Sequence, residues 1–415
     1  MSPIWIRHLL MSMVGAASLA PMHQASALGL LQAYEEALVN DPIYRVALSE
    51  KAAGQQFKAL GRSHLLPNVS ANISANKNQA DVTTATLLGD NQDRRNYTSQ
   101  AVSIQLRQPL FHPEGTARYL QGVAQTRASD AQFLIRSQEL IVRLVGLYAP
   151  AKYAEDQLAQ AIAQRDAYAE LRAASERLLI KGEGTKTEVL EAQAKYDLAE
   201  AQILEARDNL FNARNALSAM VGQDITALDK LSEDFQLKSA EPVHIEAWKE
   251  LALDNNPEIL AQRYVIEVAS KEIAKARAGH APRLDLVGNL SKNKSDTTNT
   301  FNQSTYLRSI GLQLNVPLYA GGSVDASVSQ AIANHAKAQS DLDAKISQVM
   351  VELRKQYGLI QSSALRIAAA EKALSSARLL VDATQKSVKG GIRTNLDVLN
   401  AQQQVFEAKR ELALS

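Results

Sequence analysis

The sequence predicts a mainly α-helical chain that also carries membrane β-strands. Three observations support this fold class. The first 27 residues have the pattern of an export signal. The rest of the chain repeats one order of motifs twice. Each copy combines a pair of stretches in which apolar and polar residues alternate with a long helical tract.

Export is predicted by the N-terminal segment 1–27, a signal peptide. Arg7 and His8 precede an apolar stretch, Leu9–Ala20, which is too short to span a bilayer, and Ala25-Ser26-Ala27 supplies small residues for cleavage. The chain has 45 basic and 44 acidic residues, a net charge of +1, and no cysteine. This evenly spread charge argues against a nucleic-acid partner. The lack of cysteine excludes a thiolate metal site and a lipid-anchored N-terminal cysteine.

Three pairs of anchors keep their order and nearly their spacing. They are Asn40-Asp41-Pro42 and Asn255-Asn256-Pro257, Val102–Phe111 and Ile310–Tyr319, and the stretches that begin at Gly182 and Gly391. Three matches in order make duplication much more probable than chance. We therefore expect a first repeat at 28–222, a linker at 223–246, and a second repeat at 247–415. The second repeat ends earlier in the pattern, so its last helix is expected to be truncated.

Each copy is expected to open with a helix, over Leu31–Leu65 and over Ile245–Ala278, ended by a proline. Two alternating stretches of about ten residues follow, the length that a tilted membrane strand needs. The polar links Ala80–Asn96 and Lys294–Ser304 suit loops exposed to water. The same alternation would also suit a hairpin on a soluble core, and the export signal and the duplication favour the membrane interpretation.

Long helical tracts are predicted over Gly115–Lys181 and Ser323–Lys389. The second has an apolar residue every seven positions from Ile346 to Val388, with mostly small residues three places later, which favours supercoiling against a neighbouring helix. Pro150 lies inside the first tract and is expected to kink or break it.

Each tract is expected to turn back as a helical hairpin. Glycine favours the left-handed conformation that ends a helix, and threonine can cap the helix that follows. The turns are predicted at Gly182 and Gly184 and at Gly390 and Gly391, with caps at Thr185 and Thr394.

Four strands cannot close a membrane barrel, since bacterial barrels have at least about eight. Open strand edges also cannot face lipid, because their backbone N–H and C=O groups would stay unpaired. We therefore expect several chains to share one barrel in a closed ring. The number of chains does not follow from this argument.

The chain resembles the TolC family of outer-membrane efflux and type I secretion proteins over nearly all of its mature length. The resemblance rests on the two turn motifs, on the phrases around Pro109 and Pro317, and on Arg277–Asp285, which is closest to the protein-secretion branch. It implies a homotrimer with a twelve-stranded barrel and a helical tunnel across the periplasm. It also implies contact with outer-membrane lipid, a periplasmic adaptor (a membrane fusion protein) and an inner-membrane pump, either an ABC transporter or a proton-driven one.

The resemblance further implies a periplasmic gate at the second turn. Asp397 matches the first aspartate of the family's narrowest ring, Asn400 stands in place of the second, and Arg393, next to Thr394, matches an arginine of the closed state. The equivalent positions of the first repeat are Thr185, Glu188 and Glu191. A ring of Asp397 side chains could attract cations. Alternatively, Asp397 only caps a helix start, where a carboxylate is favourable.

The function predicted is therefore an outer-membrane exit duct of a tripartite secretion or efflux system. The alternative is a soluble periplasmic coiled-coil adaptor, and a general porin is disfavoured because the chain is mostly helical. No enzyme is predicted, since the seven scattered histidines show no HExxH spacing and no phosphate loop or nucleophile elbow is present. No cofactor or metal is expected. The cargo stays open.

Overall fold

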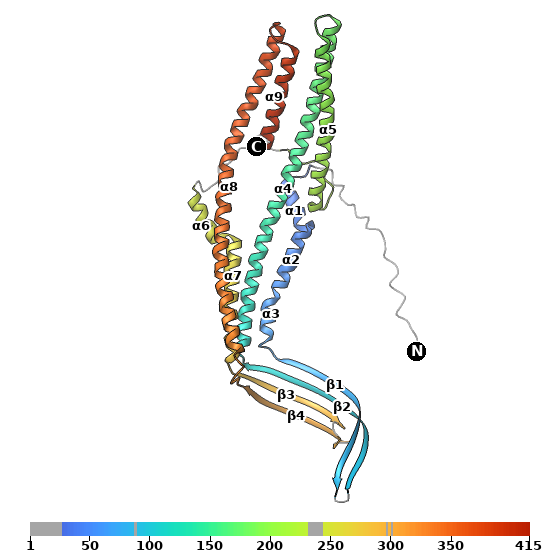
Figure 1. Cartoon of the computed structure of the whole chain (residues 1–415), viewed down its shortest axis with the longest axis vertical. Coiled ribbons are helices and arrows are strands. Elements are labelled where there is room, and N and C mark those ends of the chain that lie inside the picture. The colour runs from blue at the N-terminus through green and yellow to red at the C-terminus, as the bar shows by residue number, and fades with distance from the viewer. Residues whose placement is uncertain (1–26, 87–88, 231–243, 296–297, 300–301) are drawn as a thin grey trace, which may run out of the picture. The chain divides into compact units, whose positions relative to one another are not determined.

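The computed structural model describes residues 27–86, 89–230, 244–295, 298–299 and 302–415 (Figure 1). The predicted signal peptide lies outside these residues apart from Ala27. The helices described are α1 (Leu30–Asn40), α2 (Pro42–Gly54), α3 (Gln56–Ser63), α4 (Pro113–Ile180), α5 (Lys186–Val221), α6 (Ile245–Asn255), α7 (Pro257–Arg277), α8 (Ser323–Lys389), α9 (Asn395–Leu414) and the short 3-10 helix η1 (Ala278–His280). The strands are β1 (Asn68–Thr86), β2 (Gly89–Phe111), β3 (Arg283–Lys294) and β4 (Ser304–Asn315).

The chain divides into two compact units, and helix α4 contributes to both. One unit combines Met1–Asp41 with Leu144–Gln236, and the other combines Pro42–Arg143 with Leu237–Ser415. The order of elements, short helices, two strands and then a helical hairpin, occurs twice along the chain. The boundaries proposed for the repeats and the linker stay a prediction.

The four strands form one antiparallel sheet in the order β1-β2-β3-β4. Strands β3 and β4 end and begin where the sequence predicts. The prediction of a loop over Ala80–Asn96 was wrong, because β1 and β2 stay paired from Asn68 with Arg107 as far as Thr86 with Gly89. The polar composition of this stretch hid its strand character. Its threonines and Val82 nonetheless favour extended backbone, and the antiparallel ladder pairs the backbone whatever the polarity of the side chains.

The two long helices lie within two residues of their predicted bounds. The expected break at Pro150 does not occur, since α4 continues through it. A proline ring crowds the carbonyl four positions earlier, and that residue is Gly146, where even an added Cβ would meet no atom outside the adjoining turns of α4. The backbone therefore has room to adjust without ending the helix. Among the residues described, no helix combines the length and apolar composition needed to cross a membrane.

The first helix predicted in each copy is broken, which corrects both predictions. Asp41 and Asn256 have extended backbones, with ψ angles of 117° and 122°. Each precedes a proline, which disfavours helical geometry in the residue before it. Asn256 then caps α7, because its side-chain oxygen accepts hydrogen bonds from the backbone N–H groups of Glu258 and Ile259.

In the unit that contains the sheet, one group of helices packs through close contacts at glycines, and another pair of helices is joined by an ion pair. Helices α2 and α3 approach α4 closely through Gly54, Gly61 and Gly122, where an added Cβ would meet Ser129 or the backbone of the facing helix. Helices α7 and α8 are joined by an ion pair of 3.0 Å between Lys345 and Glu258. In the other unit, Asn40 at the end of α1 donates a hydrogen bond to the carbonyl of Val221 at the end of α5.

Candidate functional site: the two faces of the sheet and the hairpin tips

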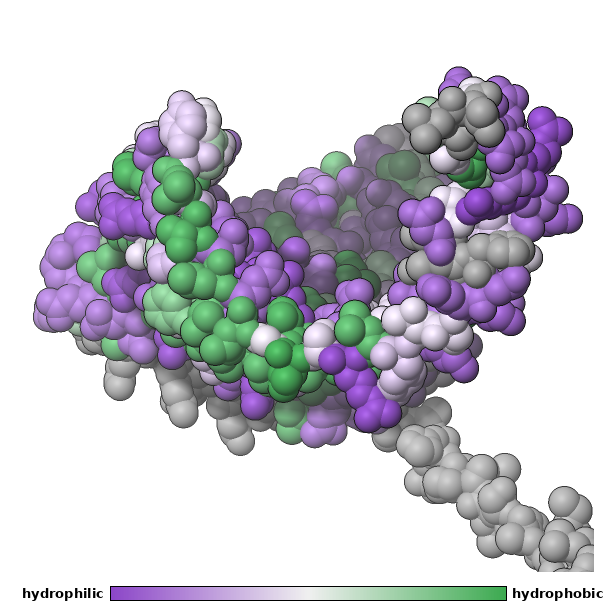
Figure 2. Space-filling view, turned by 90° about the horizontal axis from the view of Figure 1, so that it is seen from below, coloured by the Kyte–Doolittle hydropathy of each residue, from purple (hydrophilic) through white to green (hydrophobic). Residues whose placement is uncertain are grey.

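The strand register places an apolar set of side chains on one face of the sheet. Residues paired across antiparallel strands point to the same side, and Val69, Leu106, Gly288 and Ile310 form one such row. Ile73 and Ile310 on this face are 76% and 77% exposed. Figure 2 shows hydrophobic side chains gathered along the outer side of the curved sheet. This face has the composition of a surface that contacts lipid.

The opposite face of the sheet is polar and more enclosed. Ser291 is buried although its neighbours along β3, Leu290 and Lys292, are exposed, and Asp285 is buried between the half-buried Leu284 and Leu286. A hollow of about 350 Å³ lies here, and its lining includes Gln105, Arg107, Asn289, Ser309 and Gln313. A sheet with one apolar and one polar face suits an arrangement in which lipid lies on one side and water on the other.

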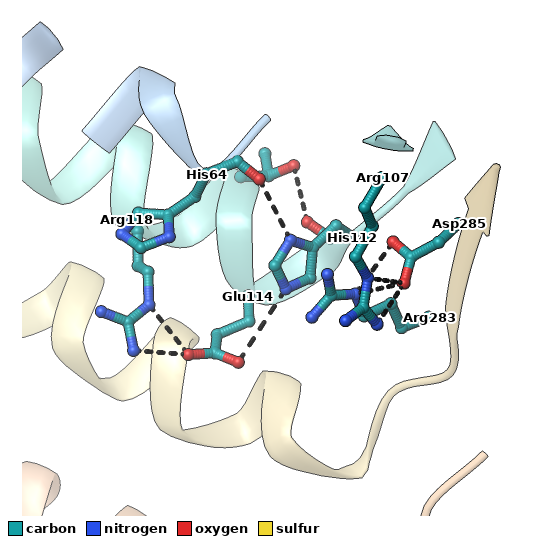
Figure 3. Close-up of polar contacts among 8 residues, drawn as sticks. His64, Arg107, His112, Glu114, Arg118, Arg283 and Asp285 are labelled. Carbon is teal, nitrogen blue, oxygen red and sulfur yellow. Dashed lines mark hydrogen bonds and ion pairs between the residues drawn. The ribbon is translucent and has the colours of Figure 1, made fainter. Parts of the chain in front are cut away.

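A buried carboxylate joins two strands on the polar face, close to the helices (Figure 3). Asp285 on β3 is 1% exposed and accepts hydrogen bonds of 2.6 and 2.8 Å from Arg107 on β2. Arg283 on β3 donates a third, of 3.0 Å. These charge-assisted bonds hold the register of β2 against β3 at the point where the strands leave the helices.

A second polar cluster lies where α3 meets β1 and where β2 passes into α4 (Figure 3). The Nδ1 atom of His112 lies 3.3 Å from the carbonyl oxygen of His64, and Glu114 forms an ion pair of 2.7 Å with Arg118. Burial lowers the pKa of His64, and the nearby Arg118 and His112 lower it further. His64 is therefore neutral at neutral pH.

The second hairpin turns as the glycines predict. Gly391 has a φ of 74°, in the left-handed region, and its N–H donates to the carbonyl of Val388. Helix α9 then begins after Thr394, whose backbone N–H and hydroxyl both donate to the carboxylate of Asp397, at 2.9 and 3.0 Å. These hydrogen bonds lower the pKa of Asp397, so this side chain is anionic at neutral pH.

The first hairpin repeats the same local geometry. Gly182 has a φ of 75°. The hydroxyl of Thr185 accepts a hydrogen bond of 3.2 Å from the backbone N–H of Glu188, whose carboxylate accepts one of 2.9 Å from the N–H of Thr185. This is a capping box. Gly184 lies against the end of α4, where an added Cβ would come within 3.1 Å of Leu178 and Leu179.

The structure therefore brings together Thr394 with Asp397 and Thr185 with Glu188. The side chains of Arg393, Asn400 and Glu191 form no hydrogen bond or ion pair with any of the residues that the structure describes. The capping interpretation of Asp397 is the one that a single chain displays. It leaves one carboxylate oxygen of Asp397 without a hydrogen bond from the described part of the chain. The gate roles of these residues stay predictions.

The seam predicted along α8 is confirmed where α9 faces it. Ala370, Leu374 and Thr384 on α8 are buried, as are Val398, Leu399 and Ala401 on α9. Among the residues that the structure describes, none forms a hydrogen bond with the buried hydroxyl of Thr384.

Comparison with known proteins connects this architecture to one family. The outer membrane efflux protein family matches residues 33–223 and 248–415. The alkaline protease secretion protein AprF of Pseudomonas aeruginosa is 41% identical over 410 residues, which cover 98% of this chain and 85% of AprF. The proteases secretion protein PrtF of Dickeya chrysanthemi is 39% identical, over 94% of this chain and 85% of PrtF.

A solved structure has the same fold. The outer membrane protein VceC of Vibrio cholerae superposes with a TM-score of 0.75 at 19% identity, covering 93% of this chain and 92% of VceC.

Proposed function

Because the chain belongs to the outer membrane efflux protein family, we propose that it is the outer-membrane exit channel of a type I secretion system whose cargo is a secreted protein. The observation that carries this proposal is the sheet with one apolar and one polar face, attached to long helical hairpins. The protein cargo rests on AprF and PrtF, which are named for protease secretion. The alternative of a soluble adaptor has no support among these relatives.

The working form of the channel is a ring of chains. Strands β1 and β4 each have an unpaired edge, and four strands are too few to enclose a pore. In a ring, β4 of one chain pairs with β1 of the next, the apolar face meets lipid, and the polar face lines the pore. We propose three chains, because the TolC resemblance implies a trimer.

The hairpin tips form the periplasmic end of the channel in this proposal, where an adaptor and an inner-membrane pump bind. Asp397 then contributes one negative charge per chain to a constriction near the second tip, flanked by Arg393 and by the neutral Asn400. Its hydrogen bonds to Thr394 hold the carboxylate in place and keep it charged. Capping and gating are therefore compatible roles for the same side chain.

Secretion and conductance together test this function. The chain is expressed with a pump, an adaptor and a protease substrate in an outer-membrane channel mutant, and protease is assayed in the medium. We expect extracellular protease only when the chain is present, and discrete single-channel conductance from the purified protein in planar bilayers. Recovery of the chain in the soluble periplasm, with no conductance, would refute the channel. Conductance and drug efflux without protease export would redirect the cargo to small molecules.

A further inference from the structure

The apolar face of the sheet ends in basic residues at the end farther from the helices. On three of the four strands, followed along this face away from the helices, the apolar run ends at Ile310 on β4, Leu290 on β3 and Ala75 on β1, and the next residue on the same face is basic. On β2 the run ends at Val102, and the next residue on this face is the neutral Gln100. The basic residues are Arg308 on β4, Lys292 and then Lys294 on β3, and Lys77 on β1. All four are exposed. We call them the basic collar.

The collar follows one boundary across the sheet. In the register of the strands, the last apolar residue moves one same-face position farther from the helices at each step, from Ile310 on β4 to Leu290, Val102 and Ala75. A boundary that steps evenly from strand to strand is what a level membrane produces on tilted strands.

The cations of the collar have no carboxylate partners among the residues that the structure describes. Basic residues farther out on the long β1–β2 hairpin differ, because Arg94 pairs with Asp81 at 2.7 Å and Arg95 with Asp93 at 2.9 Å. Within the collar, the guanidinium of Arg308 lies 4.7 Å from the ring centre of Tyr306, which is itself exposed on the same face. Tyrosine is typical of the membrane–water interface, and this stacking holds the arginine at that level.

We propose that the basic collar binds the phosphate groups of the phosphorylated glycolipid in the outer leaflet, the lipid A part of lipopolysaccharide. This inference rests on the proposed function, which places the helices in the periplasm and the far end of the sheet at the cell surface. Two features favour a lipid over a protein partner. The collar directly continues an apolar surface that lipid covers, and its unpaired cations complement the phosphates of a lipid headgroup.

Binding of lipid A to the purified channel in neutral detergent tests the collar. Native mass spectrometry compares bisphosphorylated lipid A with the same disaccharide lipid lacking phosphate, and inorganic phosphate serves as a competitor. The test variant is Lys292→Gln/Lys294→Gln/Arg308→Gln, and the matched control is Lys337→Gln/Lys355→Gln/Lys372→Gln on α8. A charge near an anionic surface contributes about fivefold in affinity, so we expect roughly a hundredfold weaker lipid A binding by the triple variant at low salt. The control should bind as the original chain does.

The single variant Lys294→Gln, expected to weaken binding about fivefold, covers the case in which the triple variant does not assemble. Equal binding of the phosphorylated and phosphate-free lipids, or unchanged binding by the variants, would overturn the collar. Strong displacement by inorganic phosphate would do so as well, because it would indicate a phosphate site that does not need a lipid. Conductance in phosphatidylcholine bilayers is measured separately. Its absence would overturn the proposed function, whereas normal conductance without phosphate preference would overturn only this inference.

Discussion

Asp285→Ala removes the carboxylate that joins Arg107 to Arg283 on the polar face of the sheet. Three charge-assisted hydrogen bonds of 2.6 to 3.0 Å are lost, and two guanidinium groups then face each other without a counter-charge. Breaking a buried ion pair by removing one partner costs about 3–5 kcal/mol. The side chains of Arg107 and Arg283 are 47% and 30% exposed and recover part of this through water. We therefore expect a loss of about 3 kcal/mol.

The assay is thermal unfolding of the purified channel in detergent, followed by circular dichroism and by loss of the oligomer on gels. A loss of this size lowers the unfolding midpoint of a chain of 415 residues by roughly 3 °C. Asp325→Ala is the matched control. Asp325 pairs with His280 at 3.2 Å, but its side chain is 81% exposed, so its removal should cost less than about 0.5 kcal/mol. The double variant Arg107→Ala/Asp285→Ala should recover part of the loss. Equal midpoints for Asp285→Ala and Asp325→Ala would refute the reasoning.

Three further predictions concern the helical hairpins. Thr185→Ala removes the cap of α5 and should cost about 1 kcal/mol locally, seen as roughly fivefold faster hydrogen exchange of the first amides of α5, whereas unchanged exchange would contradict the cap. Asp397→Ala should reduce cation selectivity and divalent-cation block in bilayer conductance, and unchanged values would remove Asp397 from the gate. In the original chain the pKa of Asp397 lies below its ordinary value of 3.8, so the negative charge and its helix-capping contribution should both be fully present above pH 3.8. Both should be lost only as the pH falls through the lowered pKa of the folded chain. Loss of cation selectivity near pH 6 would contradict this. Gly182→Ala should destabilise the hairpin by about 1 kcal/mol, because its φ of 75° strains any side chain although no atom lies close. Gly146→Ala, inside α4 with equally open surroundings, should be neutral or stabilising in the same unfolding experiment.

The type of each long element could be predicted from the sequence because the signals are local. The seven-residue spacing along α8 and the glycines at each turn act within a few residues of themselves, and the observed bounds and φ angles agree with them. Alternation predicted the strands for the same reason. It failed only over Ala80–Asn96, where polarity was taken as the sign of a loop although the ladder pairs backbone groups.

Breaks in the short helices were missed for a different reason. Pro42 and Pro257 serve as repeat anchors in the sequence, but the predicted helices Leu31–Leu65 and Ile245–Ala278 include them without a break. The extended backbones of Asp41 and Asn256 show that the steric effect of a proline on the preceding residue outweighs helix propensity at these positions. At Pro150 the long helix continues instead, where a glycine lies four positions earlier.

What the sequence by itself determined is the set of elements and the family, since periodicity and motif spacing are properties of neighbouring residues. What only the tertiary structure decided is which side chains share a face or a contact. Arg107 and Asp285 are 178 positions apart, and their pairing depends on the register of β2 against β3, which no local pattern encodes. The basic collar became visible for the same reason. Its lysines and arginine are scattered in the chain, and they follow one boundary only because backbone hydrogen bonds set the strands side by side.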